Sequence, residues 1–313
     1  MRNSSDKILD GFDPSAIDRA ATSLRNDQLV AIPTETVYGL AARASSPSAI
    51  AKIFEVKKRP KNHPLILHIA YKNDLGKWCQ NISDSARALT TNFWPGPLTV
   101  VVKRNSSVSD LITGNRDTVA IRCPAHSVTT ALLAALDDAI VAPSANRFGK
   151  VSPTNAKHVL SDLGDDIDLI LDGGDCKIGL ESTIIDCTTE PPQLLRAGAL
   201  TVEQIKAVCG IDIADAQGES RAPGMLEKHY APKCRVELVE THIKALDRKN
   251  ALDKLNVSNT ILYYGDDLEL YAKSLYAQFR QADASNIDVV IAVVPPMRGI
   301  GAAICERLKK ASF

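Results

Sequence analysis

Short apolar runs alternate with amphipathic stretches along most of this chain. Apolar runs bounded by proline, glycine or polar residues are typical of buried strands, and apolar residues three and four positions apart are typical of helices. The runs predict strands at residues 29–32, 65–70, 98–103, 118–122, 139–142, 169–172 and 182–186. The amphipathic stretches predict helices at residues 14–26, 47–57, 84–92, 128–136, 155–163 and 201–209. Because strands and helices interleave, the pattern predicts an α/β fold.

Two of the predicted helices carry a recognisable start. Asp13 precedes Pro14, and Ser46 precedes Pro47. A short polar side chain can accept a hydrogen bond from the first turn, and proline is favoured at the first helical position because its backbone angle already suits a helix. We therefore expect a helix to begin at each proline.

The pattern breaks in the region of residues 210–234 and then resumes. The segment ADAQGESRAPGMLEKHYAPK is polar, contains prolines and glycines, and lacks periodicity, which is typical of a linker. Beyond it, apolar runs predict strands at residues 236–239, 260–264 and 288–294, and helices are predicted at residues 268–281 and 300–310. We therefore expect a larger domain at residues 1–209, a linker or lid at 210–234 and a small Rossmann-like α/β domain at 235–313.

Composition narrows the class of protein. Hydrophobic residues make up 45% of the 313 residues and charged residues 24%, as in ordinary globular domains. Lysine plus arginine equals aspartate plus glutamate, 37 each, which argues against a protein whose main task is to grip a phosphate backbone. The seven cysteines include no CxxC pair, and no leader peptide or membrane-length apolar run is present, so the cytoplasm is the expected location.

Candidate chemistry begins where the first predicted strand ends. The segment PTETVYGL, residues 33–40, brings two hydroxyls, a carboxylate, a phenol and a glycine to that point. Loops at strand ends are where α/β proteins keep their sites. The same composition is also typical of a tight turn with a glycine at positive φ. The residues alone leave both interpretations open.

A basic loop, KKRPKNHPLILH at residues 57–68, precedes the next predicted strand. Cations held between two prolines suit an anion such as a triphosphate. A run of charges is also typical of a solvated surface. His68 points to a site or, taken alone, to a satisfied core histidine.

Two arginines end apolar runs, Arg122 in VAIRCP and Arg196 in LLRAG. A buried arginine requires an anion, which can be a structural carboxylate or a bound ligand. The segments APSAN and ESTIID place small hydroxyl and amide groups at further strand ends, where they suit a phosphate or a simple turn.

The absence of several known motifs reduces the number of reaction mechanisms that fit the sequence. The chain has no GxxxxGK[ST] loop, no GxSxG elbow and no zinc-ligand spacing. Covalent and metal-hydrolase mechanisms are therefore disfavoured. A site of hydroxyl and cationic donors fits transfer of a phosphorus-centred group, where positioning and charge stabilisation do most of the catalysis.

Together these segments resemble the YrdC-like threonylcarbamoyl-AMP synthases. PTETVYGL, KKRPKNHPLILH, FWPGPLTVVV, VAIRCP, APSAN and ESTIID, with LLRAG after them, stand in the order found in that family. The segment APGMLEKHYAPK and the small second domain resemble the family's long, two-domain form. The resemblance implies a twisted mixed sheet with flanking helices.

The resemblance also implies a reaction. Members of the family join L-threonine, bicarbonate (or CO2) and ATP, and release diphosphate, so this chain would be a nucleotidyltransferase. Mg²⁺ would arrive with ATP, and no tightly bound cofactor, metal site or covalent nucleophile is implied. The product would pass to transfer proteins that modify an adenosine next to the anticodon of tRNA. A weak contact of this chain with tRNA is a further expectation, and contact with a membrane is not expected.

The family's binding positions fall on specific residues of this chain. The positions for threonine are Thr36, His68, Arg122, Ala142 and Ser182. The positions for ATP are Arg59, His63, Thr118, Ser144, Ser152, Arg196 and Tyr230. A second rank of residues in the same loops comprises Thr34, Tyr38, Lys57 and Asn146. His63 stands where many relatives carry asparagine. Because Tyr230 lies in the predicted linker, its position implies that the linker folds over the cleft as a lid.

Three alternatives stay open at this point. YrdC-like domains also serve in carbamoyl transfer during hydrogenase maturation, although this chain lacks the acylphosphatase-like and zinc-finger regions of those proteins. An RNA-binding module without catalysis is the second, and the charge balance argues against it. The third is a relative of the dihydroxybutanone-phosphate synthase fold with another substrate, since a shared scaffold does not fix the site.

Overall fold

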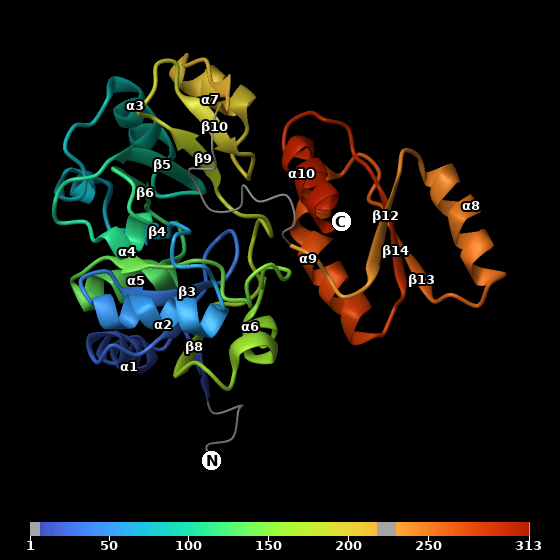
Figure 1. The fold of residues 1–313 in the computed structure, drawn as a ribbon, viewed down its shortest axis with the longest axis horizontal. Helices are drawn as coiled ribbons and strands as arrows, with labels where there is room; N and C mark the ends of the chain where they lie inside the picture. Colours follow the sequence, from blue (N-terminus) through green and yellow to red (C-terminus); the bar gives the residue numbers. More distant parts are fainter. Residues whose placement is uncertain (1–6, 218–229, 313) are drawn as a thin grey trace.

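The computed structural model describes residues 7–217 and 230–312. These residues form an eleven-stranded sheet and a three-stranded sheet, each flanked by helices (Figure 1). The strands of the larger sheet lie in the order β1 (Ile8–Asp10), β8 (Leu169–Asp172), β2 (Val30–Ile32), β3 (Gly39–Arg43), β7 (Ile140–Val141), β4 (Ile66–His68), β6 (Thr118–Arg122), β5 (Leu98–Lys103), β9 (Thr183–Asp186), β10 (Gln193–Arg196) and β11 (Ala214–Asp215). Parallel and antiparallel pairs mix along it, so the prediction of a mixed sheet is confirmed.

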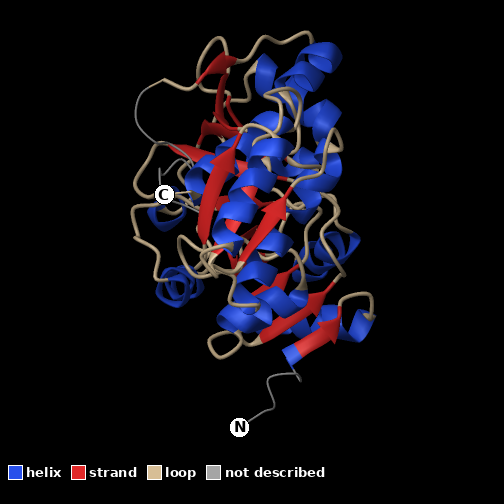
Figure 2. Ribbon diagram, turned by 90° about the vertical axis from the view of Figure 1, so that its right-hand side faces the viewer, coloured by secondary structure: helices blue, strands red, loops and turns tan. Residues whose placement is uncertain are grey.

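The helices of the larger unit lie on both faces of its sheet, which Figure 2 shows from the side. The helices α1 (Pro14–Arg25) and α5 (Ser127–Leu136) pack against each other on one face. The other face carries α2 (Pro47–Lys57), α3 (Asp84–Phe93), α4 (Asp110–Thr113), α6 (Ala156–Leu163) and α7 (Val202–Cys209). A short 3-10 helix spans Lys72–Lys77.

The predicted helix starts are confirmed by their capping hydrogen bonds. The Asp13 side chain accepts a hydrogen bond from the backbone N–H of Ser15, and Pro14 opens α1. The Ser46 hydroxyl accepts one from the N–H of Ala49, and Pro47 opens α2. Each cap satisfies a backbone donor that the first helical turn leaves without a partner.

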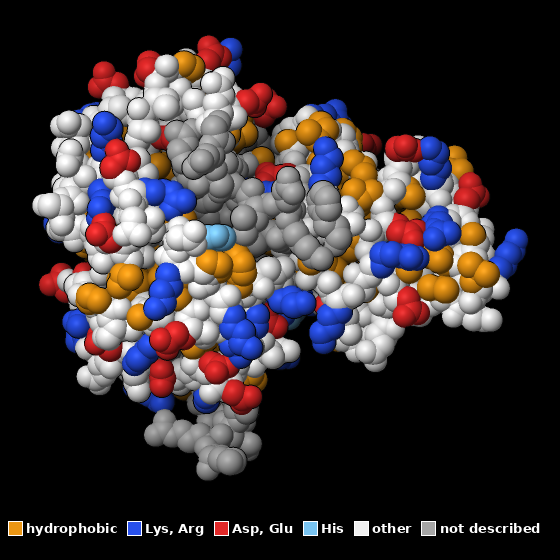
Figure 3. Space-filling model, in the orientation of Figure 1, with side chains coloured by type: hydrophobic (Ala, Val, Ile, Leu, Met, Phe, Trp, Pro, Cys, Tyr) orange, Lys and Arg blue, Asp and Glu red, His pale blue; other side chains and the backbone are white. Residues whose placement is uncertain are grey.

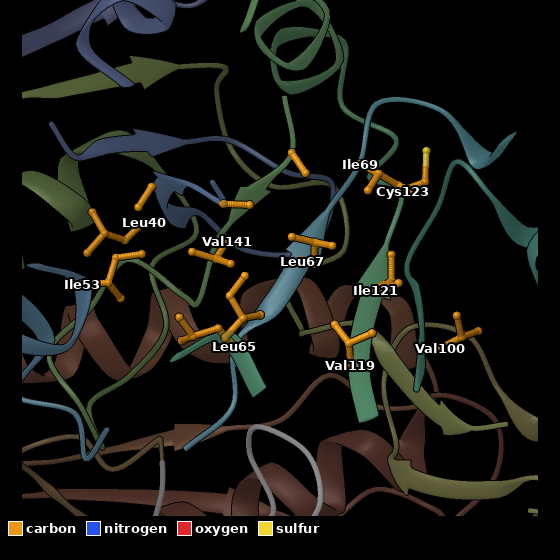
Figure 4. Packing of buried hydrophobic residues seen from close by; sticks show 14 of the residues in the cluster. Leu40, Ile53, Leu65, Leu67, Ile69, Val100, Val119, Ile121, Cys123 and Val141 are labelled. Atoms are coloured by element: carbon orange, nitrogen blue, oxygen red, sulfur yellow. The ribbon is translucent and has the colours of Figure 1, made fainter. Parts of the chain in front are cut away.

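Alternation along the central strands separates the core from the opposite face of the sheet. Leu67 and Ile121 point into the main core, together with Val141 from the neighbouring strand (Figure 4). The flanking positions His68 and Arg122 therefore point to the opposite face, because successive side chains of a strand alternate between faces. This alternation places polar groups on a face that the main core does not fill.

The smaller unit is a parallel sheet with helices, which confirms the expected Rossmann-like α/β architecture. Its strands lie in the order β12 (Arg235–Val239), β14 (Val289–Val293) and β13 (Asn259–Leu262), and both pairings are parallel. Its helices are α8 (His242–Asp253), α9 (Leu268–Ala284) and α10 (Gly301–Ala311). In Figure 1, α9 and α10 lie on the side that faces the larger unit, and α8 lies on the far side.

Several elements were not predicted from the sequence pattern. β3 is rich in small residues, and α8 buries only Ala245 and Leu252, so neither has the apolar signal of its neighbours. β1, β10, β11 and α4, which have two to four residues each, were also not predicted. Within the predicted linker, β11 pairs in parallel with β10, and residues 218–229 lie outside the described residues. No helix in the described part of the chain is long and apolar enough to cross a membrane.

Candidate active site

One pocket collects most of the candidate residues. It holds about 610 Å³ of space, open solvent included, on the face of the large sheet opposite the main core. All five positions expected for threonine line it, as do four of the positions expected for ATP and two of the second rank. These residues are Thr34, Thr36, Tyr38, Arg59, His68, Arg122, Ala142, Ser144, Ser182, Arg196 and Tyr230.

Arg122 stands at the end of β6 and is held by three groups. Its Nη2 lies 2.7 Å from Glu35 Oε1 in a buried ion pair. Its Nη1 donates to Thr36 Oγ1 at 2.9 Å, and its Nε donates to the Gly96 carbonyl at 3.3 Å. Each terminal nitrogen of a guanidinium carries two N–H groups, so donors remain for a ligand carboxylate. Arg122 can therefore pair with Glu35 and bind a ligand carboxylate at the same time.

The loop from Thr34 to Val37 is braced from within. Thr34 Oγ1 donates to the Val37 carbonyl at 2.6 Å and lies 2.8 Å from Thr36 Oγ1. The Tyr38 hydroxyl donates to the Gly174 carbonyl at 2.8 Å, away from the ligand-facing groups. These contacts make PTETVYGL both a tight turn and a wall of the pocket.

His68 lies beside Arg122 and is electrically neutral. Burial, with a further contribution from the Arg122 charge, lowers the pKa of His68 to about 3. Its Nδ1 lies 3.1 Å from the Ile66 carbonyl oxygen. Because a carbonyl oxygen only accepts, Nδ1 carries the ring proton and Nε2 is left as a hydrogen-bond acceptor. A neutral acceptor of this kind suits an amine or a hydroxyl.

The other end of the pocket carries two buried cations. Arg59 donates to the Pro64 carbonyl at 2.9 Å, and burial lowers its pKa to about 10. Arg196, at the end of β10, donates through Nη2 to the carbonyl and hydroxyl oxygens of Ser182, at 2.9 Å and 3.0 Å. Ser144 lines the wall near them. Two guanidinium groups in a pocket are an electrostatic match for phosphate groups.

Lys57 and Asn146 support this end from behind rather than lining it. The Lys57 ammonium donates to the carbonyls of Ser144 and Asn146 at 2.5 Å each. The Asn146 amide donates to the carbonyls of Arg147 and Lys150 at 2.8 Å. Burial and the nearby Arg59 hold the pKa of Lys57 well below its usual range. Both residues fix the loop that presents Ser144.

Three of the residues expected at the ATP site do not line the pocket. His63 packs edge-on against Phe148, with 5.4 Å between ring centroids, and Phe148 also contacts Arg59. Thr118 begins β6 and pairs with Lys103. Ser152 is fully buried, and its hydroxyl donates to Glu181 at 2.7 Å.

Tyr230, at the end of the predicted linker, does line the pocket. Its ring stacks on Tyr276 of α9, with 5.6 Å between centroids, and the Arg307 guanidinium of α10 lies 4.9 Å from its ring centroid. Its backbone adopts a positive φ of 62°, which is uncommon for a tyrosine. Tyr230 therefore closes one side of the pocket while held by the smaller unit.

Two carboxylates at the site were not among the predicted residues. Glu35 pairs with Arg122, and Glu181 lines the pocket beside Ser182. Both stand inside motifs that the sequence had singled out, PTETVYGL and ESTIID. Acids flanked by hydroxyls at a strand end were the available signal, but the arginine partners are distant in sequence.

The described residues contain no group of side chains suited to hold a metal ion, and the face seen in Figure 3 is not uniformly basic. Residues 7–217 and 230–312 contain no cluster of three or more histidine, cysteine or carboxylate side chains that could hold a metal ion. Figure 3 shows acidic and basic side chains interspersed over the visible face. All seven cysteines lie among the described residues, and none of them forms a disulfide.

Known proteins share both parts of this architecture. The family described as Telomere recombination (Sua5, YciO and YrdC) matches residues 22–198, and the family described as Threonylcarbamoyl-AMP synthase, C-terminal domain, matches residues 200–312. The threonylcarbamoyl-AMP synthase of Pyrococcus abyssi is 42% identical, over 94% of this chain and 93% of its own length. That of Bacillus subtilis is 39% identical, over 95% of this chain and 92% of its own length.

The likeness extends to a solved structure. The crystal structure of P. abyssi Sua5 complexed with L-threonine superposes with a TM-score of 0.89 at 40% identity, and covers 95% of this chain and 94% of that one. Sequence, domain order and fold agree over nearly the whole chain. The chain therefore belongs to the threonylcarbamoyl-AMP synthase family, in its long form with a YrdC-like domain and a Sua5-type C-terminal domain.

Proposed function

We propose that this pocket is the active site in which the chain makes threonylcarbamoyl-AMP, diphosphate and water from L-threonine, bicarbonate and ATP. One observation carries the assignment of the site. The positions expected for threonine from the family motifs, which lie far apart in sequence, line a single pocket together with cations expected for ATP. The family membership supplies the reaction.

The threonine side of the proposed site is formed by Arg122, Thr36 and His68. Arg122 binds the threonine carboxylate with the N–H donors that Glu35 and Thr36 leave available. His68 Nε2 accepts a hydrogen bond from the amine or the hydroxyl, because its Nδ1 already faces the Ile66 carbonyl. A site that hydrogen-bonds a substrate hydroxyl rejects an analogue without it, since buried polar groups are then left without partners.

The nucleotide side is formed by Arg59, Arg196, Ser144 and Tyr230. The two guanidinium groups offset the charge that builds on the leaving diphosphate. Mg²⁺ enters with ATP as part of the substrate, bound chiefly by the phosphates, which is its usual mode in nucleotide sites. His63 and Thr118, which lie outside the pocket wall, take part only if the basic loop or β6 shifts when ATP binds.

The reaction needs positioning more than covalent catalysis. Bicarbonate takes up a proton and loses water to give CO2. The neutral amine of threonine adds to CO2 and releases a proton, which balances the proton taken up, and the product is a carbamate. A carbamate oxygen then attacks the α-phosphorus of ATP, and the bond to the diphosphate breaks in line. Pocket residues hold the two reactants in that geometry, and closure around them limits attack by water on the labile carbamate.

The product is a mixed anhydride that must be passed on before it hydrolyses. We propose that tRNA-modifying transfer proteins consume it in the cytoplasm. A direct contact with tRNA is a minor part of this proposal, since the net charge of the chain is zero.

A direct test measures diphosphate release from the purified chain with ATP, bicarbonate and L-threonine. We expect release to require all three, and to fall about a hundredfold or more when L-valine replaces L-threonine. Omission of bicarbonate is the matched control for background ATP hydrolysis. Release that does not depend on threonine would contradict the proposed function.

A further inference from the structure

Glu181 places a negative charge in the pocket that the expected chemistry does not call for. Its side chain is buried, and it lines the same pocket as Arg59 and Arg196 on the nucleotide side. A buried carboxylate facing a triphosphate would repel it, because charges interact strongly where water is excluded. The site therefore needs something that cancels this charge.

The compensating groups come largely from the smaller unit. Arg307 Nε of α10 donates to Glu181 Oε2 at 2.9 Å. The Tyr276 hydroxyl of α9 donates to the same oxygen at 3.0 Å. From the larger unit, the Ser152 hydroxyl donates to Oε1 at 2.7 Å. Glu181 therefore links Ser152, a residue expected at the ATP site, to the helices α9 and α10 of the smaller unit.

Several contacts hold Arg307 in this position. It is fully buried, its Nη2 donates to the Ala197 carbonyl at 3.0 Å, and its Nη1 lies 3.1 Å from Glu306 Oε2. Its guanidinium also lies against the ring of Tyr230. A buried arginine that pairs with two carboxylates and donates to a carbonyl cannot be removed without stranding a charge.

The two units contact each other closely enough to fix the positions of Glu181 and Arg307. A Cβ on Gly179 would lie 2.6 Å from the Lys273 backbone in α9, so only glycine fits there. Arg280 of α9 forms an ion pair with Asp162 of α6 at 2.6 Å. Both contacts flank the Glu181 cluster, and they fix where α9 and α10 meet the pocket.

The charge state of Glu181 follows from this environment. The groups that face it are Ser152, Tyr276, Arg307, Arg196 and Tyr230, and Glu306 faces Arg307 from α10. Burial alone would raise its pKa, but Arg307 and then Arg196 lower the pKa of Glu181 to about 2. The Glu181 carboxylate is therefore ionised, and the neighbouring arginine charges offset its negative charge.

We infer that Glu181 is a positioning residue for adenylation and that Arg307 is the counterion that lets the pocket accept the triphosphate. Glu181 holds Ser152 and the Tyr276–Tyr230 stack in place, and Arg307 cancels its charge from the smaller unit. The inference rests on the proposed function, because it assumes that ATP occupies this side of the pocket.

The test compares four variants with the wild-type protein by steady-state diphosphate release. They are Arg307→Gln, Glu181→Gln, the double variant and Arg248→Gln. Arg248 is the matched control, because it pairs with Glu237 on the surface of the smaller unit. We expect Arg307→Gln to raise KM for ATP about tenfold or more, with a much smaller change in KM for threonine. Arg248→Gln should keep wild-type kinetics. Glu181→Gln and the double variant should stay within about threefold of wild type in KM for ATP, because no buried negative charge faces the triphosphate, but kcat should fall about tenfold, because Ser152 and Tyr276 lose the group that positions them.

The pH dependence of KM for ATP distinguishes the loss of the Arg307 charge from the loss of the Arg307 shape. In Arg307→Gln, the loss of the cation lets burial raise the pKa of Glu181, so protonation becomes accessible. We expect the defect in KM for ATP, relative to wild type, to shrink as the pH is lowered from about 8 to about 6. Neither Glu181→Gln nor Arg248→Gln should show that trend.

Two results would overturn the inference. One is a folded Arg307→Gln protein with the wild-type KM for ATP. The other is a double variant whose KM for ATP is as high as that of Arg307→Gln. If Arg307→Gln does not fold, the double variant decides, because position 181 then carries no charge and Glu306 keeps its ion pair with Lys310. Wild-type protein that releases no diphosphate with threonine would instead contradict the proposed function.

Discussion

Two buried acid–arginine pairs each place one member in the pocket wall, Arg122 in the first and Glu181 in the second, and they differ in where their partners come from. Glu35 and Arg122 both belong to the larger unit, and their closest atoms are 2.7 Å apart. Glu181 and Arg307 belong to different units, and their closest atoms are 2.9 Å apart. The first pair lies at the threonine side, and the second lies at the nucleotide side.

The difference shows how each side of the pocket is assembled. Folding of the large sheet is sufficient to bring Glu35 to Arg122. The nucleotide side is complete only when α9 and α10 dock against the larger unit. We therefore expect changes at the first pair to act on threonine, and changes at the docking surface to act on ATP.

Loss of Arg122 should have the largest effect. Arg122→Gln removes the cation expected to bind the threonine carboxylate and leaves Glu35 as a buried, stranded charge. We expect kcat/KM for threonine to fall about a hundredfold or more, with KM for ATP nearly unchanged. Steady-state kinetics with each substrate varied in turn measure both values.

Arg43→Gln is the matched control for that change. Arg43 lies on the same sheet, and its ion pair with Asp27 is partly exposed. It should keep wild-type kinetics. An Arg122→Gln protein that loses affinity for ATP instead of threonine would reverse the assignment of the two sides.

A methyl group at Gly179 should disturb the docking surface specifically. Gly179→Ala meets the backbone of Lys273 and also strains a φ of 81°. We expect a loss of about 2–3 kcal/mol in the free energy of unfolding, together with a higher KM for ATP. Chemical denaturation and the two-substrate kinetics measure these effects.

Gly174→Ala supplies the comparison for Gly179. Gly174 has the same φ of 81°, but a Cβ there meets nothing within 4 Å. It should therefore show the backbone strain alone, about 1 kcal/mol. Equal losses in the two variants would show that the contact with α9 is not what Gly179 preserves.

Acid should lower the free energy of unfolding through His68, which lies on the threonine side of the pocket. The folded protein holds the pKa of His68 at about 3, whereas the unfolded chain has its ordinary value of 6.5. Between these values the unfolded state binds the extra proton, so stability falls as the pH drops below about 6.5. We expect His68 to account for a loss of about 2 kcal/mol between pH 7 and pH 5.

The measurement for His68 is the difference between wild type and His68→Gln in denaturant unfolding at both pH values. Other groups, such as His158, titrate equally in the two proteins and cancel in that difference. An identical loss of stability in both proteins would mean that His68 is not held neutral.

The smallest effect is expected at Glu35. Glu35→Gln keeps the shape of the side chain and removes the charge next to Arg122. We expect about a tenfold rise in KM for threonine, because the guanidinium is less firmly oriented. KM for ATP should not change, and a change there would break the distinction between the two pairs.

The sequence predicted seven of the eleven strands of the large sheet, because each of those seven is a compact apolar run. It failed for α8, where Ala245 and Leu252 are the buried residues. The threonine-side residues were assigned to one site through the family resemblance, because the residues of PTETVYGL and VAIRCP alone also fit a tight turn and a structural ion pair.

The nucleotide side depended on contacts that no local pattern encodes. Glu181 and Arg307 are 126 residues apart. Nothing around Arg307 distinguishes it from other basic residues of an amphipathic helix. Tyr230 was expected at the site through the family resemblance, but its stacking on Tyr276 could come only from the tertiary structure.

The most direct test of the central claim identifies the product. The wild-type chain is incubated with ATP, L-threonine and isotopically labelled bicarbonate, and the nucleotide products are analysed by mass spectrometry. Our account predicts an adenylate that contains threonine and the labelled carbon, formed in equal amount with diphosphate. An adenylate of threonine without the label, or diphosphate without any threonine adduct, would contradict it.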